Sequence, residues 1–176
     1  MSGLTSVLLC VLCGKKSYES STAMEFAATA CVADGQADDS YRIELLFCRS
    51  TVVKDFLAVS IAAIVGANLR FLLSRLAARE FGPAFPVGTL VINILGSFIV
   101  GFFVIWTTER VLVDPRWRLL VVVGFCGSFT TFSSYAFETM SYFEHGQWGL
   151  LLTNVLSNNL LCLGSALGGM ALARAL

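Results

Sequence analysis

The stretch VGTLVINILGSFIVGFFVIWTT at residues 87–108 contains no charged side chain, and it decides the fold class. Three other stretches are similarly long and apolar: 56–76, 119–137 and 146–173. The first of these carries only Arg70 and Arg75. A helix needs about 20 apolar residues to cross a bilayer. We therefore predict an all-α integral membrane protein with four transmembrane helices, at 56–78, 86–108, 117–143 and 148–173.

The composition excludes most classes of soluble protein. Of the 176 residues, 56% are apolar and 14% are charged, whereas a soluble domain is about 25% charged. The mean hydropathy is +0.77. Twelve basic and twelve acidic side chains cancel, which argues against a nucleic-acid partner and leaves the lipid bilayer as the expected one. The sequence shows no nucleophile–base pair and no metal-binding cluster, so we predict that the protein is not an enzyme.

Residues 1–52 differ from the rest of the chain, and we treat them as an N-terminal extension before a membrane domain at 53–176. The extension holds ten charged residues and four of the six cysteines. Its short apolar run lacks the preceding basic residues of a secretory signal. Cys10 and Cys13 form a single CxxC without a second pair at zinc spacing, so no metal site is predicted there. We assign the extension no function.

The boundary of the extension suggests a simple origin. The segment VKDFLAVSIAAIVGANLR, which starts at Val53, looks like the natural N-terminus of a small bacterial membrane protein. Valine is also the residue that the standard code assigns to an initiator GTG read internally. We therefore hypothesise that translation starts at Val52 or Val53, which would make residues 1–52 an artefact of the start site.

Polar side chains inside the apolar stretches are the first candidates for function. All five asparagines lie within predicted membrane helices: Asn68, Asn93, Asn154, Asn158 and Asn159. Thr89, Asn93 and Ser97 share one face of their helix, and Asn154, Asn158 and Ser165 share one face of theirs. Two interpretations remain open. The stripes provide hydrogen bonds between helices, or they line a narrow polar path.

Small residues predict close packing between helices. Gly164 and Gly168 form a GxxxG motif, and Ala62 and Gly66 have the same spacing. Gly96 and Gly101 lie on the helix at 86–108. Small side chains let helix backbones approach closely in a membrane. We therefore expect a compact bundle or an oligomer.

The segment GFCGSFTTFSSY at 124–135 is poor material for an unbroken helix. It contains two glycines and five hydroxyl residues in the middle of a predicted span. A break there would free backbone carbonyls, and carbonyl groups commonly bind a hard cation. Aromatic rings recur every three residues along the segment, at Phe129, Phe132 and Tyr135. We predict an interrupted helix at this position.

Three motifs together resemble one family, the small fluoride channels known as Fluc or CrcB. They are GAxxRF at 66–71, GTLVINILGSFIVG at 88–101, and GFCGSFTTFSS at 124–134 followed by Glu138. The resemblance covers about 54–174. It implies a four-helix fluoride channel domain whose third helix is broken at its centre, assembled as an antiparallel, dual-topology homodimer. It also implies passive efflux of fluoride across the cell membrane, which lowers cytoplasmic fluoride and its toxicity.

The resemblance further implies roles for particular residues. The backbone carbonyls of Gly127 and Thr130 would bind a structural sodium ion that is required but not transported. Each fluoride pathway would be lined by Asn93, Phe132 and Tyr135. Further lining candidates are Thr89, Ser133, Ser134 and Asn158. Arg70 would anchor a helix end or pack near the pore mouth.

Basic residues bear on the dual topology. Five of them fall on the side of the N-terminus: Lys54, Arg110, Arg116, Arg118 and Arg174. Arg75 and Arg79 fall on the other side, joined by Arg70 if its side chain reaches that surface. Such a mild bias is compatible with insertion in both orientations.

The alternative function is a small four-helix, proton-coupled multidrug exporter. Such an antiporter needs a carboxylate within its first membrane helix, and no acidic residue lies between Asp55 and Glu80. A subunit that transports nothing is a third interpretation, although it would leave the polar stripes without a purpose. Fluoride conduction is the prediction that accounts for all three motifs.

Overall fold

The computed structural model describes residues 39–82, 85–111 and 113–176. The chain divides into two units, Met1–Phe56 and Leu57–Leu176. The second unit contains the site described below. The predictions about Cys10 and Cys13 lie outside the described residues.

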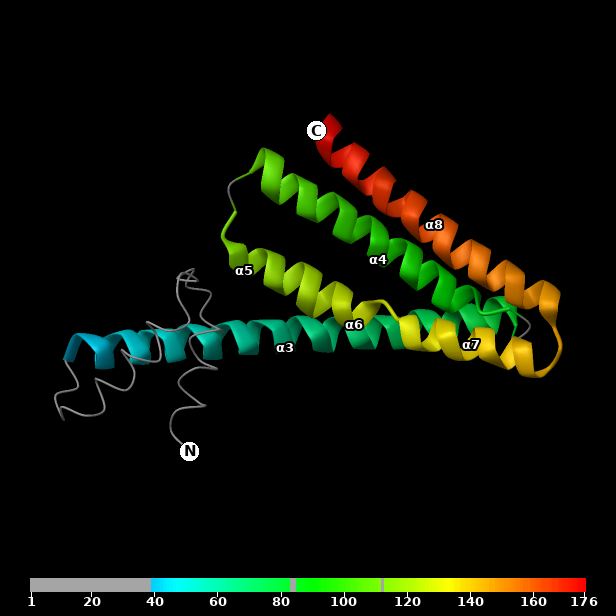
Figure 1. The fold of residues 1–176 in the computed structure, drawn as a ribbon, viewed down its shortest axis with the longest axis horizontal. Helices are drawn as coiled ribbons and strands as arrows, with labels where there is room; N and C mark the ends of the chain where they lie inside the picture. Colours follow the sequence, from blue (N-terminus) through cyan, green and yellow to red (C-terminus); the bar gives the residue numbers. More distant parts are fainter. Residues whose placement is uncertain (1–38, 83–84, 112) are drawn as a thin grey trace, which may run out of the picture. The chain divides into compact units, whose positions relative to one another are not determined.

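Helices account for nearly all of the described chain (Figure 1). They are α3 (Asp39–Phe81), α4 (Val87–Ile105), the π-helical turn η1 (Trp106–Arg110), α5 (Pro115–Arg118), the π-helical segment η2 (Leu119–Cys126), α6 (Gly127–Phe129), α7 (Phe132–Glu144) and α8 (Trp148–Ala175). Four stretches are long and apolar enough to cross a membrane: Val52–Phe81, Val87–Glu109, Pro115–Glu144 and Trp148–Ala175. These stretches confirm the four predicted spans; the second has the expected length, and the other three are slightly longer than expected.

The spans begin where local chemistry favours a helix start. Pro86 is the N-cap residue of α4. Pro115 is the first residue of α5, where the carboxylate of Asp114 accepts a hydrogen bond from the N–H of Arg116 at 2.9 Å. Proline suits this first position because its missing N–H would have no helical partner there. Pro115 is therefore also the first residue of the third span.

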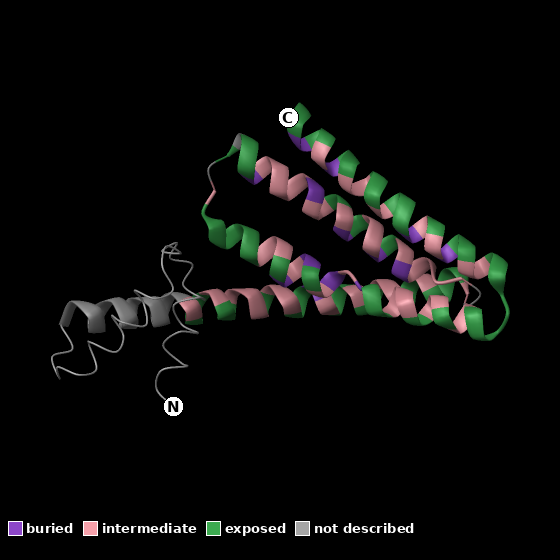
Figure 2. Ribbon diagram, in the orientation of Figure 1, coloured by how far each residue is buried: buried purple, intermediate pink, exposed green. Residues whose placement is uncertain are grey.

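Glycines bring α4 and α8 together. Gly101 on α4 faces the backbone of Ala166, and Gly169 on α8 faces the backbone of Phe98. The two helices lie side by side, and the few buried positions of the chain fall mainly where spans face one another (Figures 1 and 2). The close packing predicted for Gly101 is thus confirmed.

The GxxxG motif does not pack within this chain. Gly164 and Gly168 are exposed, and a methyl group added at either one would meet no heavy atom of the described residues within 4 Å. Gly66, by contrast, is buried against Phe125 and Ser128, which places α3 against the third span. Within one chain, the packing expectation is therefore correct for Gly66, whereas the GxxxG pair makes no close contact with the described residues.

Replacing Gly101 by alanine should lower the stability of the folded protein. The added methyl group would lie 3.0 Å from the carbonyl carbon of Ala166 and 3.1 Å from its Cα. Backbone cannot swing aside as a side chain can, so we expect a loss of about 1–3 kcal/mol. The measurement is the unfolding temperature of the purified protein in detergent.

Gly149→Ala is the matched control for this variant. Gly149 is an exposed residue of α8, and its added methyl group would meet no described heavy atom within 4 Å. Alanine also favours a helix by about 1 kcal/mol over glycine. The control should be at least as stable as the unmodified protein. Equal unfolding temperatures for the two variants would contradict the close contact at Gly101.

Candidate functional site

The third span is interrupted at two residues. Thr130 has φ −75° and ψ 159°, and Thr131 has φ −149° and ψ 108°, so both are extended between α6 and α7. The chain bends only mildly there (Figure 1). In a continuous helix the N–H groups of Thr131 and Ser134 would pair with the carbonyls of Gly127 and Thr130. Here those two N–H groups bond to side chains instead, at 2.9 and 3.2 Å.

Asn93 of α4 pairs with the backbone that the interruption exposes. Its Oδ1 accepts from the N–H of Thr131 at 2.9 Å, and its Nδ2 donates to the carbonyl of Thr131 at 3.2 Å. An amide side chain suits this position because it carries one acceptor and two donors. Asn93 thus replaces, across 38 positions of sequence, the helical partner that the N–H of Thr131 has lost.

A cluster of hydroxyl groups begins α7. Thr131 is buried and is the N-cap residue, and its Oγ1 accepts from the N–H of Ser134 at 3.2 Å. The same hydroxyl donates to Oγ of Ser134 at 2.9 Å and lies 3.3 Å from Oγ of Ser133. The N-cap bond explains why the helix restarts at Phe132. Three hydroxyl groups therefore meet at membrane depth.

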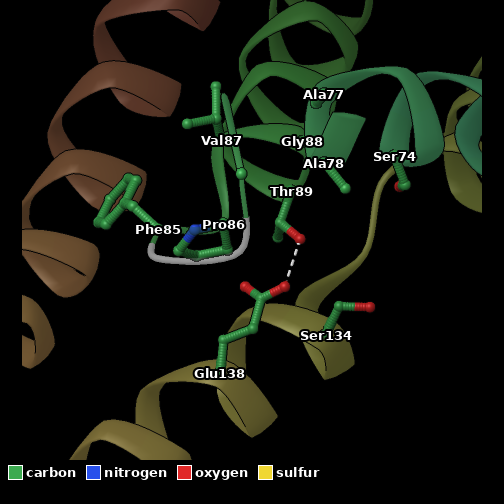
Figure 3. A pocket seen from close by; sticks show the side chains of 11 residues that line it. Ser74, Ala77, Ala78, Phe85, Pro86, Val87, Gly88, Thr89, Ser134 and Glu138 are labelled. Atoms are coloured by element: carbon green, nitrogen blue, oxygen red, sulfur yellow. Dashed lines mark hydrogen bonds between the residues drawn. The ribbon is translucent and has the colours of Figure 1, made fainter. Parts of the chain in front are cut away.

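A pocket of about 330 Å³ adjoins this cluster (Figure 3). The Oγ1 of Thr89 donates to Oε1 of Glu138 at 2.6 Å, and Ser134 lies beside them on the pocket wall. Oε2 of Glu138 is buried without a hydrogen-bond partner among the described residues. The remaining lining comes from the end of α3, the start of α4 and the connection between them, and includes Ser74, Gly82 and Phe85. Ser134 therefore joins the pocket to the hydroxyl cluster.

The polar stripes of α4 and α8 meet each other. Nδ2 of Asn93 donates to Oδ1 of Asn158 at 3.3 Å, and Oγ of Ser165 donates to the carbonyl of Ile94 at 2.8 Å. Asn158 is buried. Hydrogen bonding between helices, one of the two interpretations of the stripes, is confirmed. Nδ2 of Asn93 therefore donates two hydrogen bonds within the chain, one to Thr131 and one to Asn158.

The predicted aromatic pair lies at the start of α7. The rings of Phe132 and Tyr135 are 5.5 Å apart and meet edge to face at 61°. Phe132 is 78% exposed in the single chain, whereas Tyr135 is half-buried. The Tyr135 hydroxyl accepts from Nδ2 of Asn159 on α8 at 3.2 Å. The helices of one chain therefore do not enclose Phe132.

The structure gathers most of the predicted site residues around the interruption. Asn93, Ser133, Ser134 and Asn158 are linked through Thr131 or through one another, and Thr89 lies on the pocket that Ser134 also lines. Arg70 is half-buried in the middle of its span, eleven residues before the end of α3.

Two further residues of the site were missed from the sequence, Thr131 and Glu138, and Asn154 was predicted only as a member of the polar stripe on its helix. Thr131 lies three residues before Ser134, which is the spacing between an N-cap residue and the N–H group that it caps. This spacing in the sequence could have indicated a helix start at Phe132. Glu138 was noticed only as part of a motif. It is the one carboxylate between residues 115 and 143, and an acidic residue inside a membrane span is itself a functional candidate.

The interruption leaves two backbone carbonyls without their helical donors. The carbonyls of Gly127 and Thr130 have lost the N–H groups that a continuous helix would supply, and carbonyl oxygens are groups that can bind a hard cation. Gly127 is exposed, and an added methyl group there would have only the carbonyl oxygen of Val122 nearby, at 3.7 Å. The described residues contain no group of three His, Cys, Asp or Glu side chains that could hold a metal.

Comparison with known proteins identifies the family. The family described as CrcB-like protein, Camphor Resistance (CrcB), matches residues 57–170. The chain belongs to the CrcB family. A CrcB relative from Koribacter versatilis is 56% identical over 124 residues, which are 70% of this chain and 98% of the relative. Relatives from Sulfurihydrogenibium sp. and Legionella pneumophila are each 43% identical, covering 70% of this chain and 100% and 92% of their own lengths. All three are named fluoride-specific ion channel FluC.

Proposed function

We propose that this protein is a fluoride channel of the cell membrane, through which fluoride leaves the cytoplasm passively. The observation that carries the proposal is the cluster of amide and hydroxyl groups at the interruption of the third span, next to a pocket of about 330 Å³. The names of its CrcB relatives give the ion. Four apolar spans place the protein in the membrane as a multi-pass protein.

The polar groups suit an anion that must pass without being trapped. Conduction needs binding that permits both entry and exit. Hydroxyl and amide hydrogens can replace part of a hydration shell, and no basic side chain lies between residues 119 and 137 to hold an anion strongly. Ser134 accepts from Thr131, which leaves its own hydrogen available to an ion beside the pocket.

A homodimer with antiparallel subunits would complete this pathway. Phe132 is 78% exposed in one chain, so a second subunit is needed to enclose its ring. Gly164 and Gly168 leave a smooth exposed strip on α8, on which another helix can pack closely. Cross-linking in native membranes, followed by mass measurement of the linked species, tests this assembly. A protein that stays monomeric under linking conditions would contradict it.

Sodium is the proposed structural ion. The carbonyls of Gly127 and Thr130 would hold it. A bound cation would compensate the partial negative charge of carbonyls that lack helical partners. Hydroxyl and amide groups of the chain would then solvate fluoride, while the sodium ion stays in place.

Efflux from proteoliposomes tests the proposed function. Purified protein is reconstituted into vesicles loaded with fluoride or chloride, and ion loss is followed with selective electrodes. Fluoride should leave rapidly after the membrane potential is collapsed by an ionophore, and chloride should stay inside. Transport that needs a proton gradient would favour the exporter. Equal loss of the two anions would contradict a fluoride channel.

Removing sodium should stop the fluoride flux. Without a cation, the carbonyls of Gly127 and Thr130 would be left unpaired at membrane depth, and the interruption would lose its geometry. We expect flux at the level of protein-free vesicles in sodium-free buffer, and recovery when sodium is restored. Potassium or N-methylglucamine at equal ionic strength is the control. Equal fluxes with and without sodium would contradict the proposed site.

A further inference from the structure

Two asparagines one helical turn apart are buried on α8. Asn154 has 0% of its surface exposed and Asn158 has 5%. A buried amide is costly unless its polar atoms find partners. Both amides have hydrogen-bond partners, and the donor and acceptor of each bond show which way each amide is turned.

The hydrogen bonds of these two asparagines belong to one continuous series in which every donor points the same way. Nδ2 of Asn93 donates to Oδ1 of Asn158 at 3.3 Å, and Nδ2 of Asn158 donates to Oδ1 of Asn154 at 2.9 Å. Nδ2 of Asn154 then donates to Oγ1 of Thr139 at 3.0 Å, and Thr139 donates to the carbonyl of Tyr135 at 2.7 Å. All donors point the same way, so each bond polarises the next. This series of bonds begins at Asn93 on α4, which pairs with the interruption, and ends on α7.

Asn154 determines which way round the Asn158 amide sits. The NH₂ group of Asn158 faces two acceptors of Asn154, the backbone carbonyl at 3.1 Å and Oδ1 at 2.9 Å. Turned over, Asn158 would place its oxygen against those two oxygens and its NH₂ group against the NH₂ group of Asn93. The observed orientation presents an acceptor to Asn93.

We propose that Asn154 is a positioning residue of the anion pathway, which keeps the oxygen of Asn158 turned toward Asn93. This inference rests on the proposed function, since it requires fluoride to pass Asn93. Oδ1 of Asn158 accepts a hydrogen bond from Nδ2 of Asn93 at 3.3 Å, which is the longest bond of the series. This bond satisfies the Asn93 amide while no ion is present. It breaks when an arriving fluoride accepts the same hydrogen.

The orientation matters because a turned amide would bind the ion. An NH₂ group of Asn158 beside Asn93 would add a second donor, hold fluoride more tightly and slow its exit. A purely structural role predicts something else. Loss of a contact between α7 and α8 would reduce the amount of folded channel, and the fluoride concentration for half-maximal current would stay the same.

The first test is Asn154→Leu, which keeps the volume and removes both polar atoms. Purified channels are recorded in planar bilayers over a range of fluoride concentrations. We expect the half-saturating fluoride concentration to fall about fivefold, the effect of roughly one net hydrogen bond on an equilibrium, with a similar fall in the maximal current. Thr153→Val is the matched control. Thr153 is exposed on α8, its hydroxyl bonds only to the carbonyl of Gly149 among the described residues, and its replacement should leave both quantities unchanged.

Two more variants separate positioning from packing. Asn154→Asp in its protonated form offers one acceptor and one donor, like the amide, and should restore the unmodified half-saturating concentration at acidic pH. Thr139→Val keeps both asparagines and removes the acceptor that holds Asn154, so it should shift the half-saturating concentration in the same direction by a smaller factor. This variant decides the question if Asn154→Leu fails to fold.

The outcomes are distinct. Unchanged half-saturating concentrations in Asn154→Leu and Thr139→Val would overturn the positioning role, and so would a protonated Asp variant that behaves like the Leu variant. An unmodified protein that carries no fluoride current would overturn the proposed function instead.

Discussion

Replacing Phe132 by isoleucine should reduce fluoride flux to the level of protein-free vesicles. The hydrogens at the edge of an aromatic ring carry partial positive charge and can solvate a small anion, whereas an aliphatic side chain of similar bulk cannot. Phe132 is 78% exposed in the single chain, so the substitution leaves no cavity in the folded subunit. The loss would therefore report on conduction, and proteoliposome efflux measures it.

Phe137→Ile is the matched control for the loss of an aromatic ring. Phe137 lies on the same helix, is 77% exposed, and was not predicted to line the pathway. Its variant should conduct like the unmodified protein. Both variants should elute from a sizing column as the unmodified protein does. Normal flux through Phe132→Ile would overturn the aromatic pathway, and equal loss in both variants would indicate a general effect of removing rings.

Tyr135→Phe distinguishes the ring from its hydroxyl group. The hydroxyl accepts a hydrogen bond from Asn159 at 3.2 Å, which ties α7 to α8. The ring edge is retained in the variant, so we expect conduction with unchanged selectivity for fluoride over chloride. A variant without flux would show that the phenolic group takes part in conduction.

The spans could be predicted from the sequence because their signal is local. A run such as 87–108 without a charge can satisfy its own backbone in lipid only as a helix, because a strand would need the neighbours of a closed barrel. The interruption was also foreseen, because glycine, serine and threonine crowd the segment 124–135. Its position at Thr130 and Thr131 was not, because Asn93 fixes it from another helix.

Contacts between distant residues account for what the sequence did not reveal. Thr89 and Glu138 are 49 positions apart, and neither residue type indicates the other as its partner. The GxxxG motif illustrates the same point. α8 carries Gly164, Gly168 and Gly169, and only the third packs against α4. A helix with several glycines has more than one face on which another helix could pack closely. Which face does so depends on the tertiary arrangement of the helices.

Asn93→Asp should be the second variant with severe loss, and fluoride flux should again fall to the background. An ionised carboxylate offers acceptors only. The carbonyl of Thr131 and Oδ1 of Asn158 would each face a carboxylate oxygen in place of the NH₂ group that now donates to them at 3.2 and 3.3 Å. The added negative charge would also repel the permeating anion. We expect a loss of stability of about 1–3 kcal/mol as well, the cost of leaving a buried polar group unpaired.

Asn93→Ser and Asn93→Leu separate the charge from the lost bonds. Serine retains a donor and an acceptor on a shorter side chain, so it should keep more flux than Asp and elute as the unmodified protein does. Leucine removes the pairing with Thr131 without adding charge. If Asn93 donates to fluoride, Leu should be as inactive as Asp even in the fraction that folds. If Asn93 only holds the interruption, folded Leu channels should conduct. Normal flux through the Asp variant would mean that Asn93 does not face the ion, because no anion pathway could tolerate a carboxylate in place of its donor.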